Sequence, residues 1–128
     1  MADLVVLDTH ALVWWTSEPS KLGKRARAAI EGAGRIGVPA IAFWEVALLA
    51  RKRRLSLGMP MEAWTAQVLD IARVLELPLT AAIAIRADAL AMHDDPADRF
   101  IASTALAHGP LVTKDALMRK VPGLATLW

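Results

Sequence analysis

Cysteine is absent from the 128 residues of the sequence. The chain therefore has no disulfide bonds and no thiolate metal site, and any bound metal must be held by oxygen or imidazole ligands. Oxygen ligands favour hard cations such as Mg²⁺ or Mn²⁺. Because 55% of the residues are hydrophobic, the chain has enough apolar surface to form a core without covalent cross-links.

The sequence also lacks a hydrophobic run long enough to cross a membrane. Its most apolar stretch, residues 36–50, contains Glu45 and is shorter than the roughly 20 residues that a membrane-spanning helix needs. The apolar run at residues 4–7 has acidic residues on both sides and no basic segment before it, unlike a secretory signal peptide. We therefore expect a cytoplasmic protein, with residues 1–128 forming a single domain and no membrane segment.

The net charge is only +2, but the basic residues are unevenly distributed. One group lies between Lys21 and Arg27, and a second is the basic run Arg51, Lys52, Arg53 and Arg54. Such groups either contact the phosphates of a nucleic acid or form solvated helix faces and ends. The sequence leaves both interpretations open.

Short apolar runs alternate with helical patterns along the chain. We predict strands at residues 4–7, 36–38, 74–77, 111–113 and 124–127. We predict helices at residues 11–16, 20–33, 40–52, 60–72, 81–92, 96–108 and 114–120, with Ser20 and Thr80 as N-terminal caps. Because no hairpin signal separates the strands, this alternation predicts an α/β sandwich around a mainly parallel sheet.

Four acidic residues form a candidate site, and two of them, Asp8 and Asp115, stand where a parallel sheet binds ligands. Asp8 and Asp115 follow predicted strands, Asp98 lies in the first turn of a predicted helix, and Glu45 lies in the middle of an apolar helix. Ligands of such sheets bind beyond the carboxyl ends of the strands. Four carboxylates in one crevice would repel one another without a divalent cation between them. Mg²⁺ or Mn²⁺ would suit such a site and would activate water for hydrolysis of a phosphodiester.

Each acid also has a purely structural interpretation. Asp95 would cap the helix that Pro96 begins, and Asp98 would interact with the positive end of its dipole. Asp8 and Asp115 would cap the helices that follow their strands. Capping does not explain Glu45, which needs either a metal ion or an arginine as its partner.

Histidines and tryptophans give weaker signals. His10 and His93 adjoin the acids, but no two histidines have the spacing of metal ligands, so we expect them to be solvated or to support the carboxylates. The five tryptophans are dispersed along the chain, which favours core packing and a subunit interface over a stacking platform for bases: Trp14, Trp15, Trp44, Trp64 and Trp128.

Four segments and the terminal Trp128 together resemble a known family. The segments are residues 7–15, 44–47, 93–102 and 112–115, in this order and at these spacings. With them the chain resembles PIN-domain ribonucleases, specifically the VapC toxins of type II toxin–antitoxin modules. The resemblance covers nearly the whole chain.

This resemblance implies a PIN-like three-layer α/β/α sandwich with about five short strands, and an endoribonuclease that depends on Mg²⁺ or Mn²⁺. It implies an acidic quartet of Asp8, Glu45, Asp98 and Asp115, in which Asp8 and Asp98 are the metal ligands and the other two complete the site. Thr113 and Asp95 match accessory positions. For a ribonuclease, the clustered charge of the basic run leads us to expect that Arg51, Lys52, Arg53 and Arg54 bind the RNA backbone. The family also implies a homodimer and a small antitoxin that inserts a segment, often with an arginine, into the acidic pocket.

Two positions depart from the family pattern. Ala42 stands where members often have serine or threonine, which removes a hydroxyl near Glu45, and Ala97 stands where phenylalanine is common. Two other functions remain open: a catalytically silent PIN-like module that binds RNA or a protein, and a structure-specific DNA nuclease with the same metal chemistry. A phosphate-accepting receiver domain is disfavoured, because the third predicted strand ends in Leu77 and Pro78 and not in an aspartate.

Overall fold

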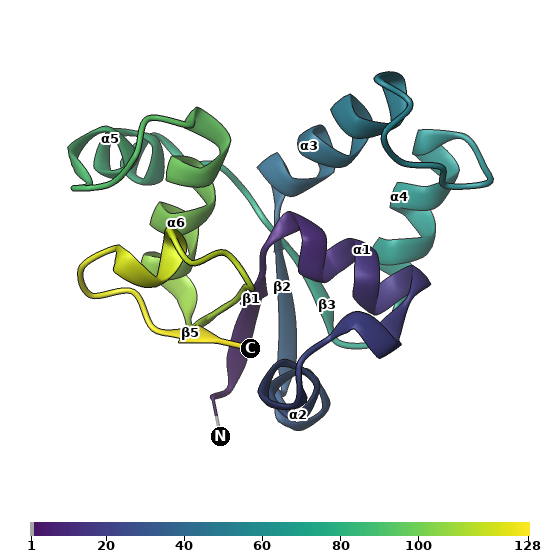
Figure 1. The fold of residues 1–128 in the computed structure, drawn as a ribbon, viewed down its shortest axis with the longest axis horizontal. Coiled ribbons are helices and arrows are strands. Elements are labelled where there is room, and N and C mark those ends of the chain that lie inside the picture. The colour runs from purple at the N-terminus through teal and green to yellow at the C-terminus, as the bar shows by residue number, and fades with distance from the viewer. Residues whose placement is uncertain (1) are drawn as a thin grey trace.

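Five short strands form one parallel sheet at the centre of the structure, a computed structural model that describes residues 2–128 (Figure 1). They are β1 (Leu4–Leu7), β2 (Arg35–Pro39), β3 (Val74–Leu77), β4 (Leu111–Val112) and β5 (Thr126–Leu127). Their order across the sheet is β3-β2-β1-β4-β5, and every neighbouring pair is parallel. The predicted parallel sheet is thus confirmed.

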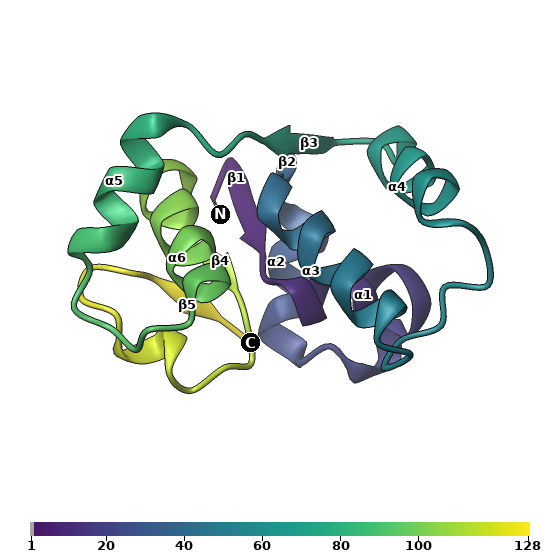
Figure 2. The same cartoon turned by 90° about the horizontal axis from the view of Figure 1, so that it is seen from above.

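Helices cover both faces of this sheet. They are α1 (Thr9–Ser17), α2 (Lys24–Gly32), α3 (Ala40–Arg51), α4 (Met61–Asp70), α5 (Ala81–Ala89) and α6 (Pro96–His108), with two 3₁₀ turns, η1 (Pro19–Lys21) and η2 (Met118–Lys120). In Figures 1 and 2, α5 and α6 lie on one side of the strands and α1 and α4 on the other. This arrangement confirms the predicted three-layer sandwich.

Strand β1 divides the core in two because its side chains alternate between the faces of the sheet. Val5 and Leu7 pack in the cluster formed by α1, α2, α3 and α4, whereas Val6 packs in the cluster formed with α6. All three side chains are almost fully buried. A strand buried on both faces requires a continuous apolar run, which is why the sequence identified it.

The order of the strands creates a crevice at their carboxyl ends. The chain passes from β1 through β2 to β3 at one edge, then crosses back to place β4 on the other side of β1. The connections that leave β1 and β4 therefore run to opposite sides, and ligands of open α/β sheets bind at such a point. Asp8 follows β1 and Thr113 follows β4, so both lie at this crevice.

The predicted start of the second helix was wrong. Ser20 lies in the separate turn η1, Leu22 is extended, and Gly23 is the N-cap of α2. The cause is distant in sequence: the Ala26 N–H donates to the carbonyl of Trp128 at 2.9 Å, and a Cβ at position 23 would collide with that carbonyl.

Helix α5 ends three residues earlier than predicted, at Ala89. The guanidinium of Arg99, from α6, donates to the carbonyls of Ala87 and Leu90 at 3.0 Å and of Met92 at 2.7 Å. Ala87 lies in the last turn of α5, and Leu90 and Met92 follow the helix, so these bonds hold the helix end against α6. They also fix the loop that leads to the start of α6.

The helix predicted at residues 114–120 is only the short turn η2. Asp115 Oδ1 accepts a hydrogen bond from the Leu117 N–H at 2.9 Å, a local turn that competes with helix formation. Smaller differences affect other ends: α1 begins at Thr9, α4 ends at Asp70, and β5 covers only Thr126–Leu127. Among residues 2–128, none of the helices has both the length and the hydropathy that crossing a membrane requires.

Candidate metal centre

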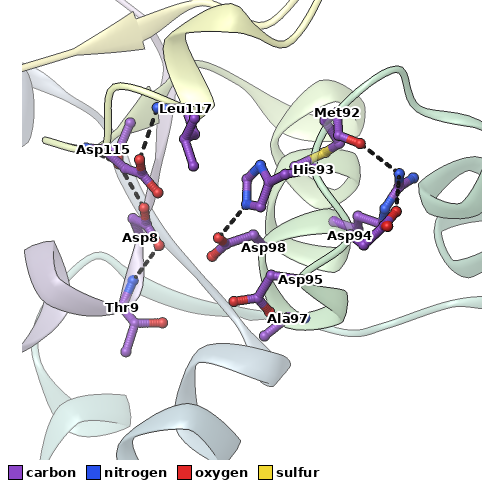
Figure 3. Close-up of polar contacts among 12 residues, drawn as sticks. Asp8, Thr9, Met92, His93, Asp94, Asp95, Ala97, Asp98, Asp115 and Leu117 are labelled. Atoms are coloured by element: carbon purple, nitrogen blue, oxygen red, sulfur yellow. Dashed lines mark hydrogen bonds and ion pairs between the residues drawn. The ribbon is translucent and has the colours of Figure 1, made fainter.

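Three carboxylates from three different elements meet at the crevice. Asp8 follows β1, Glu45 lies on α3, and Asp98 lies in the first turn of α6. One oxygen from each lies within 4.8 Å of those of the other two. We call these three residues the acidic cluster. Figure 3 shows the side chains of Asp8 and Asp98 facing one another.

Asp8 combines a structural role with a place in the acidic cluster. It is the N-cap of α1, where its Oδ1 accepts the Thr9 N–H at 2.8 Å, and it is only 4% exposed. Its Oδ2 accepts the hydroxyl of Thr113 at 2.6 Å. The capping interpretation of Asp8 is therefore correct, and it is compatible with a metal ligand. Thr113 orients this carboxylate, as an accessory residue would.

Glu45 receives a hydroxyl that sequence reasoning missed. The Thr9 side chain donates to Glu45 Oε1 at 2.6 Å, while Ala42, one helical turn before Glu45, is fully buried. Thr9 thus supplies the kind of group that the family pattern places at position 42. The only signal in the sequence was a threonine directly after Asp8. The part of the chain described holds no arginine paired with Glu45, so the alternative of an internal ion pair is not found.

Asp98 is held by a neighbouring histidine. His93 Nε2 lies 2.7 Å from Asp98 Oδ2, and both side chains are mostly buried (Figure 3). Asp95 is the N-cap of α6 and accepts the Ala97 N–H at 3.1 Å, as the structural interpretation expected. His93 therefore supports a carboxylate, in agreement with the prediction for the histidines.

Asp115 lies at the edge of the site and outside the acidic cluster. Its N–H donates to Thr113 Oγ1 at 3.0 Å, and its carboxylate accepts the Leu117 N–H. Thr113 thus links the backbone of Asp115 to the carboxylate of Asp8. The structure brings three members of the predicted quartet together and places the fourth beside them.

Like charges and burial act together on two of the carboxyls. Burial raises the pKa of Glu45, the hydroxyl of Thr9 opposes this, and the charge of Asp8 adds to the increase. Burial likewise raises the pKa of Asp98, His93 opposes it, and the charge of Asp95 adds to it. Half-buried carboxylates that repel one another at this distance fit a divalent cation with oxygen ligands.

His10 adjoins the acidic cluster as a neutral side chain. Its Nε2 accepts the Lys114 N–H at 2.9 Å, so the ring proton lies on Nδ1, which is 3.8 Å from Asp8 Oδ2. Nε2 is occupied by this bond. His10 therefore supports the site from outside and is not placed as a metal ligand.

Two of the tryptophans are not dispersed in space. The rings of Trp14 and Trp128 lie 5.7 Å apart, and His10 packs against both at 5.2 and 5.7 Å. This contact fixes the end of the chain against α1, which the sequence spacing did not reveal. Trp64 is buried in the core as predicted, whereas Trp44 is 55% exposed.

A cavity of about 320 Å³ opens beside the acidic cluster, and the basic run reaches it only in part. Its lining includes the acidic cluster and Arg54, with Val13 and Leu49 among the apolar side chains. The other three residues of the basic run do not line it. The basic residues between Lys21 and Arg27 lie on η1 and α2, and none of them lines this cavity.

Comparisons with known proteins agree with this geometry. The PIN domain family matches residues 5–124. The chain is 40% identical to Ribonuclease VapC22 of Mycobacterium tuberculosis, over 97% of this chain and 98% of that protein.

Solved structures show the same fold at lower identity. VapBC2 of Rickettsia felis, solved with a DNA fragment from its promoter, matches with a TM-score of 0.66 and 18% identity over 96% of both chains. FitAcB of Neisseria gonorrhoeae matches with a TM-score of 0.56 and 23% identity over 95% of both chains. From the match over residues 5–124 and the full-length relative, we conclude that the chain belongs to the PIN-domain family and to the VapC group within it.

Proposed function

We propose that this protein is a metal-dependent endoribonuclease and the toxin of a toxin–antitoxin pair. One observation carries the proposal: three carboxylates converge within 4.8 Å at the crevice of a chain that is 40% identical to Ribonuclease VapC22 over 97% of its length. The proposed reaction is hydrolysis of an RNA phosphodiester with departure of the 3′-oxygen. We propose that residues 1–128 act as one PIN domain in the cytoplasm.

The side chains divide the work of the site. Asp8 and Asp98 would hold Mg²⁺ or Mn²⁺, and Glu45 and Asp115 would complete the cluster or orient the attacking water. When bound, such an ion polarises the phosphate and makes water more acidic. Each carboxylate of the acidic cluster has one oxygen held by a neighbouring side chain, which fixes its orientation. Thr113 holds Asp8, Thr9 holds Glu45, and His93 holds Asp98. Asp95 adds charge beside them.

An antitoxin and a second copy of the chain are the proposed protein partners. The resemblance to VapC toxins implies an antitoxin segment that enters the acidic pocket, often with an arginine. The acidic cluster supports this proposal, since it has no arginine partner of its own in residues 2–128. A guanidinium placed between these carboxylates would relieve their mutual repulsion and exclude the metal.

The proposal is tested by cleavage of a total-RNA pool with antitoxin-free protein. We expect discrete fragments with Mg²⁺ or Mn²⁺ and none with EDTA. Retained RNA binding without cleavage by folded, metal-loaded protein would instead indicate a silent binding module. If DNA is added as a competing substrate and the protein cleaves it in preference to RNA, the protein would instead be a DNA nuclease.

Replacing Thr9 by valine should lower the affinity for Mn²⁺. The substitution keeps the size of the side chain and removes the hydroxyl that donates a hydrogen bond to Glu45, so the pKa of Glu45 rises further. Loss of a hydrogen bond behind a metal ligand costs about 10- to 100-fold in metal affinity or activity. Titration of Mn²⁺ by thermal shift measures the effect, with Thr9→Ser as the matched control that keeps the hydroxyl. Equal affinities for Thr9→Val and the wild type would show that this contact does not serve the metal.

A further inference from the structure

Only the last member of the basic run lines the cavity beside the acidic cluster. Arg54 lines the cavity that the acidic cluster opens into. All four residues of the basic run are exposed, but Arg51, Lys52 and Arg53 lie outside this lining. The four residues are adjacent in sequence, yet the structure separates one from the other three.

A helix-ending turn places Arg54 at the cavity. Arg53 has a left-handed backbone with φ of 58°, its N–H donates to the Ala50 carbonyl at 3.1 Å, and the Arg54 N–H donates to the Leu49 carbonyl at 2.9 Å. These two bonds are those of a Schellman motif, which reverses the chain at the end of a helix. Leu49 and Glu45 lie one turn apart on the same face of α3. The turn therefore folds Arg54 back over the face that carries Glu45.

The residue in the left-handed position of the turn is Arg53, and arginine does not by itself favour that backbone conformation. Glycine is the usual residue at a left-handed helix end, because a side chain disfavours that backbone. Here the residue is Arg53, whose conformation is held by the two backbone bonds of the turn. Replacement of Arg53 by glycine should keep the turn, and with it the position of Arg54.

The charge of the cavity explains what Arg54 contributes. Three ionised carboxylates with one divalent cation leave a net charge of −1, which repels an incoming phosphate. His10 and Arg54 are the basic residues among those that line the cavity in residues 2–128. Because His10 Nε2 accepts a hydrogen bond, Arg54 supplies the positive charge. A guanidinium binds phosphate oxygens through paired hydrogen bonds.

We infer that Arg54 is a substrate-binding residue that contacts a phosphate next to the cleaved bond, and that the other three basic residues do not. The assignment rests on the proposed endoribonuclease function. Val13, Trp14 and Leu55 also line the cavity and give the adjoining nucleoside an apolar surface. Arg54 thus fixes the position of the bound RNA strand relative to the acidic cluster.

The test compares Arg54→Ala with Arg51→Ala, a second arginine of the basic run, and with Arg35→Ala, an exposed arginine at the amino end of β2. With an RNA that the wild type cleaves, Arg54→Ala should raise KM about tenfold, as expected for loss of a charged hydrogen bond. In EDTA, binding of a fluorescein-labelled single-stranded RNA should lose about 0.7 from its salt slope, the value for one phosphate contact. The two control variants should change both quantities little.

Affinity for Mn²⁺ separates this role from a purely structural one. Removal of a positive charge near the acidic cluster should tighten Mn²⁺ binding by about twofold in Arg54→Ala, while Arg54→Lys and Arg35→Ala leave it unchanged. Arg53→Gly should behave as the wild type in RNA binding and cleavage. Equal effects of Arg54→Ala and Arg51→Ala, or weaker Mn²⁺ binding in Arg54→Ala, would overturn the inference. Failure of the wild type to cleave any RNA would instead overturn the proposed function.

Discussion

Asp8→Asn and Asp98→Asn each reduce metal-dependent RNA cleavage by about a thousandfold while the protein stays folded. The two residues provide oxygens of the acidic cluster, and a bound cation contributes several kcal/mol to stabilisation of the transition state. The fold survives because asparagine is as good a helix cap as aspartate and so keeps the role of Asp8 at α1. Initial rates with Mn²⁺, together with circular dichroism, measure both parts of this prediction.

Asp94→Asn is the matched control for these variants. Asp94 lies just before α6, four residues from Asp98, but its side chain is fully exposed and forms only a long ion pair with Arg99 at 3.4 Å. Its substitution should leave cleavage within about twofold of the wild type, because exposed pairs contribute little. If folded Asp8→Asn and Asp98→Asn cleaved as fast as Asp94→Asn, the acidic cluster would not be the catalytic site.

Neutral substitutes in the acidic cluster make the metal-free protein more stable at neutral pH. Burial raises the pKa of Glu45 and of Asp98, so the folded state binds protons more tightly than the unfolded state. Stability of the metal-free protein therefore falls as pH rises from the ordinary pKa of each carboxyl to its raised value, and is level above it. Glu45→Gln and Asp98→Asn remove this loss and should raise Tm by about 3–5 °C.

The dependence on pH and metal distinguishes this effect from general stabilisation. The gain in Tm of Glu45→Gln over the wild type should vanish below the ordinary pKa of 4.5, grow as pH rises from there to the raised pKa, and stay level above it. Mn²⁺ should raise the Tm of the wild type more at pH 8 than at pH 5, because the ion competes with protons. The variant should lose most of that metal effect. Lower stability of metal-free Glu45→Gln at pH 8 would contradict the electrostatic explanation.

The sheet and the approximate place of the site could be predicted because both depend on local sequence. A run such as residues 4–7, buried on both faces, is apolar throughout and is bounded by polar residues. Residues that follow the strands must lie at one edge of a parallel sheet, which brings Asp8 and Asp115 to the same side without knowledge of the strand order. Glu45 was added because a carboxylate in the middle of an apolar helix needs a partner, and the family pattern matched all four acids, including Asp98, to one site.

Contacts between distant residues could not be predicted in the same way. Asp8 and Thr113 are 105 residues apart, and nothing in the spacing of Thr9 and Glu45 indicates a hydrogen bond. The start of α2 depends on Trp128, and the end of α5 depends on the guanidinium of Arg99; each partner comes from another part of the chain. Boundaries set by tertiary contacts override local preference, and therefore the prediction of Ser20 as a helix cap was wrong.

Crystallography with Mn²⁺ tests the central proposal most directly. Crystals are grown in the presence of Mn²⁺, and diffraction data are collected at a wavelength where manganese scatters anomalously. The anomalous signal locates the ion without any assumption about its ligands. We predict one anomalous peak among the oxygens of Asp8, Glu45 and Asp98, and no such peak in Asp98→Asn. A peak bound only elsewhere, or none at saturating Mn²⁺ in a crystal with an open cavity, would contradict the assignment of this cluster as a metal centre.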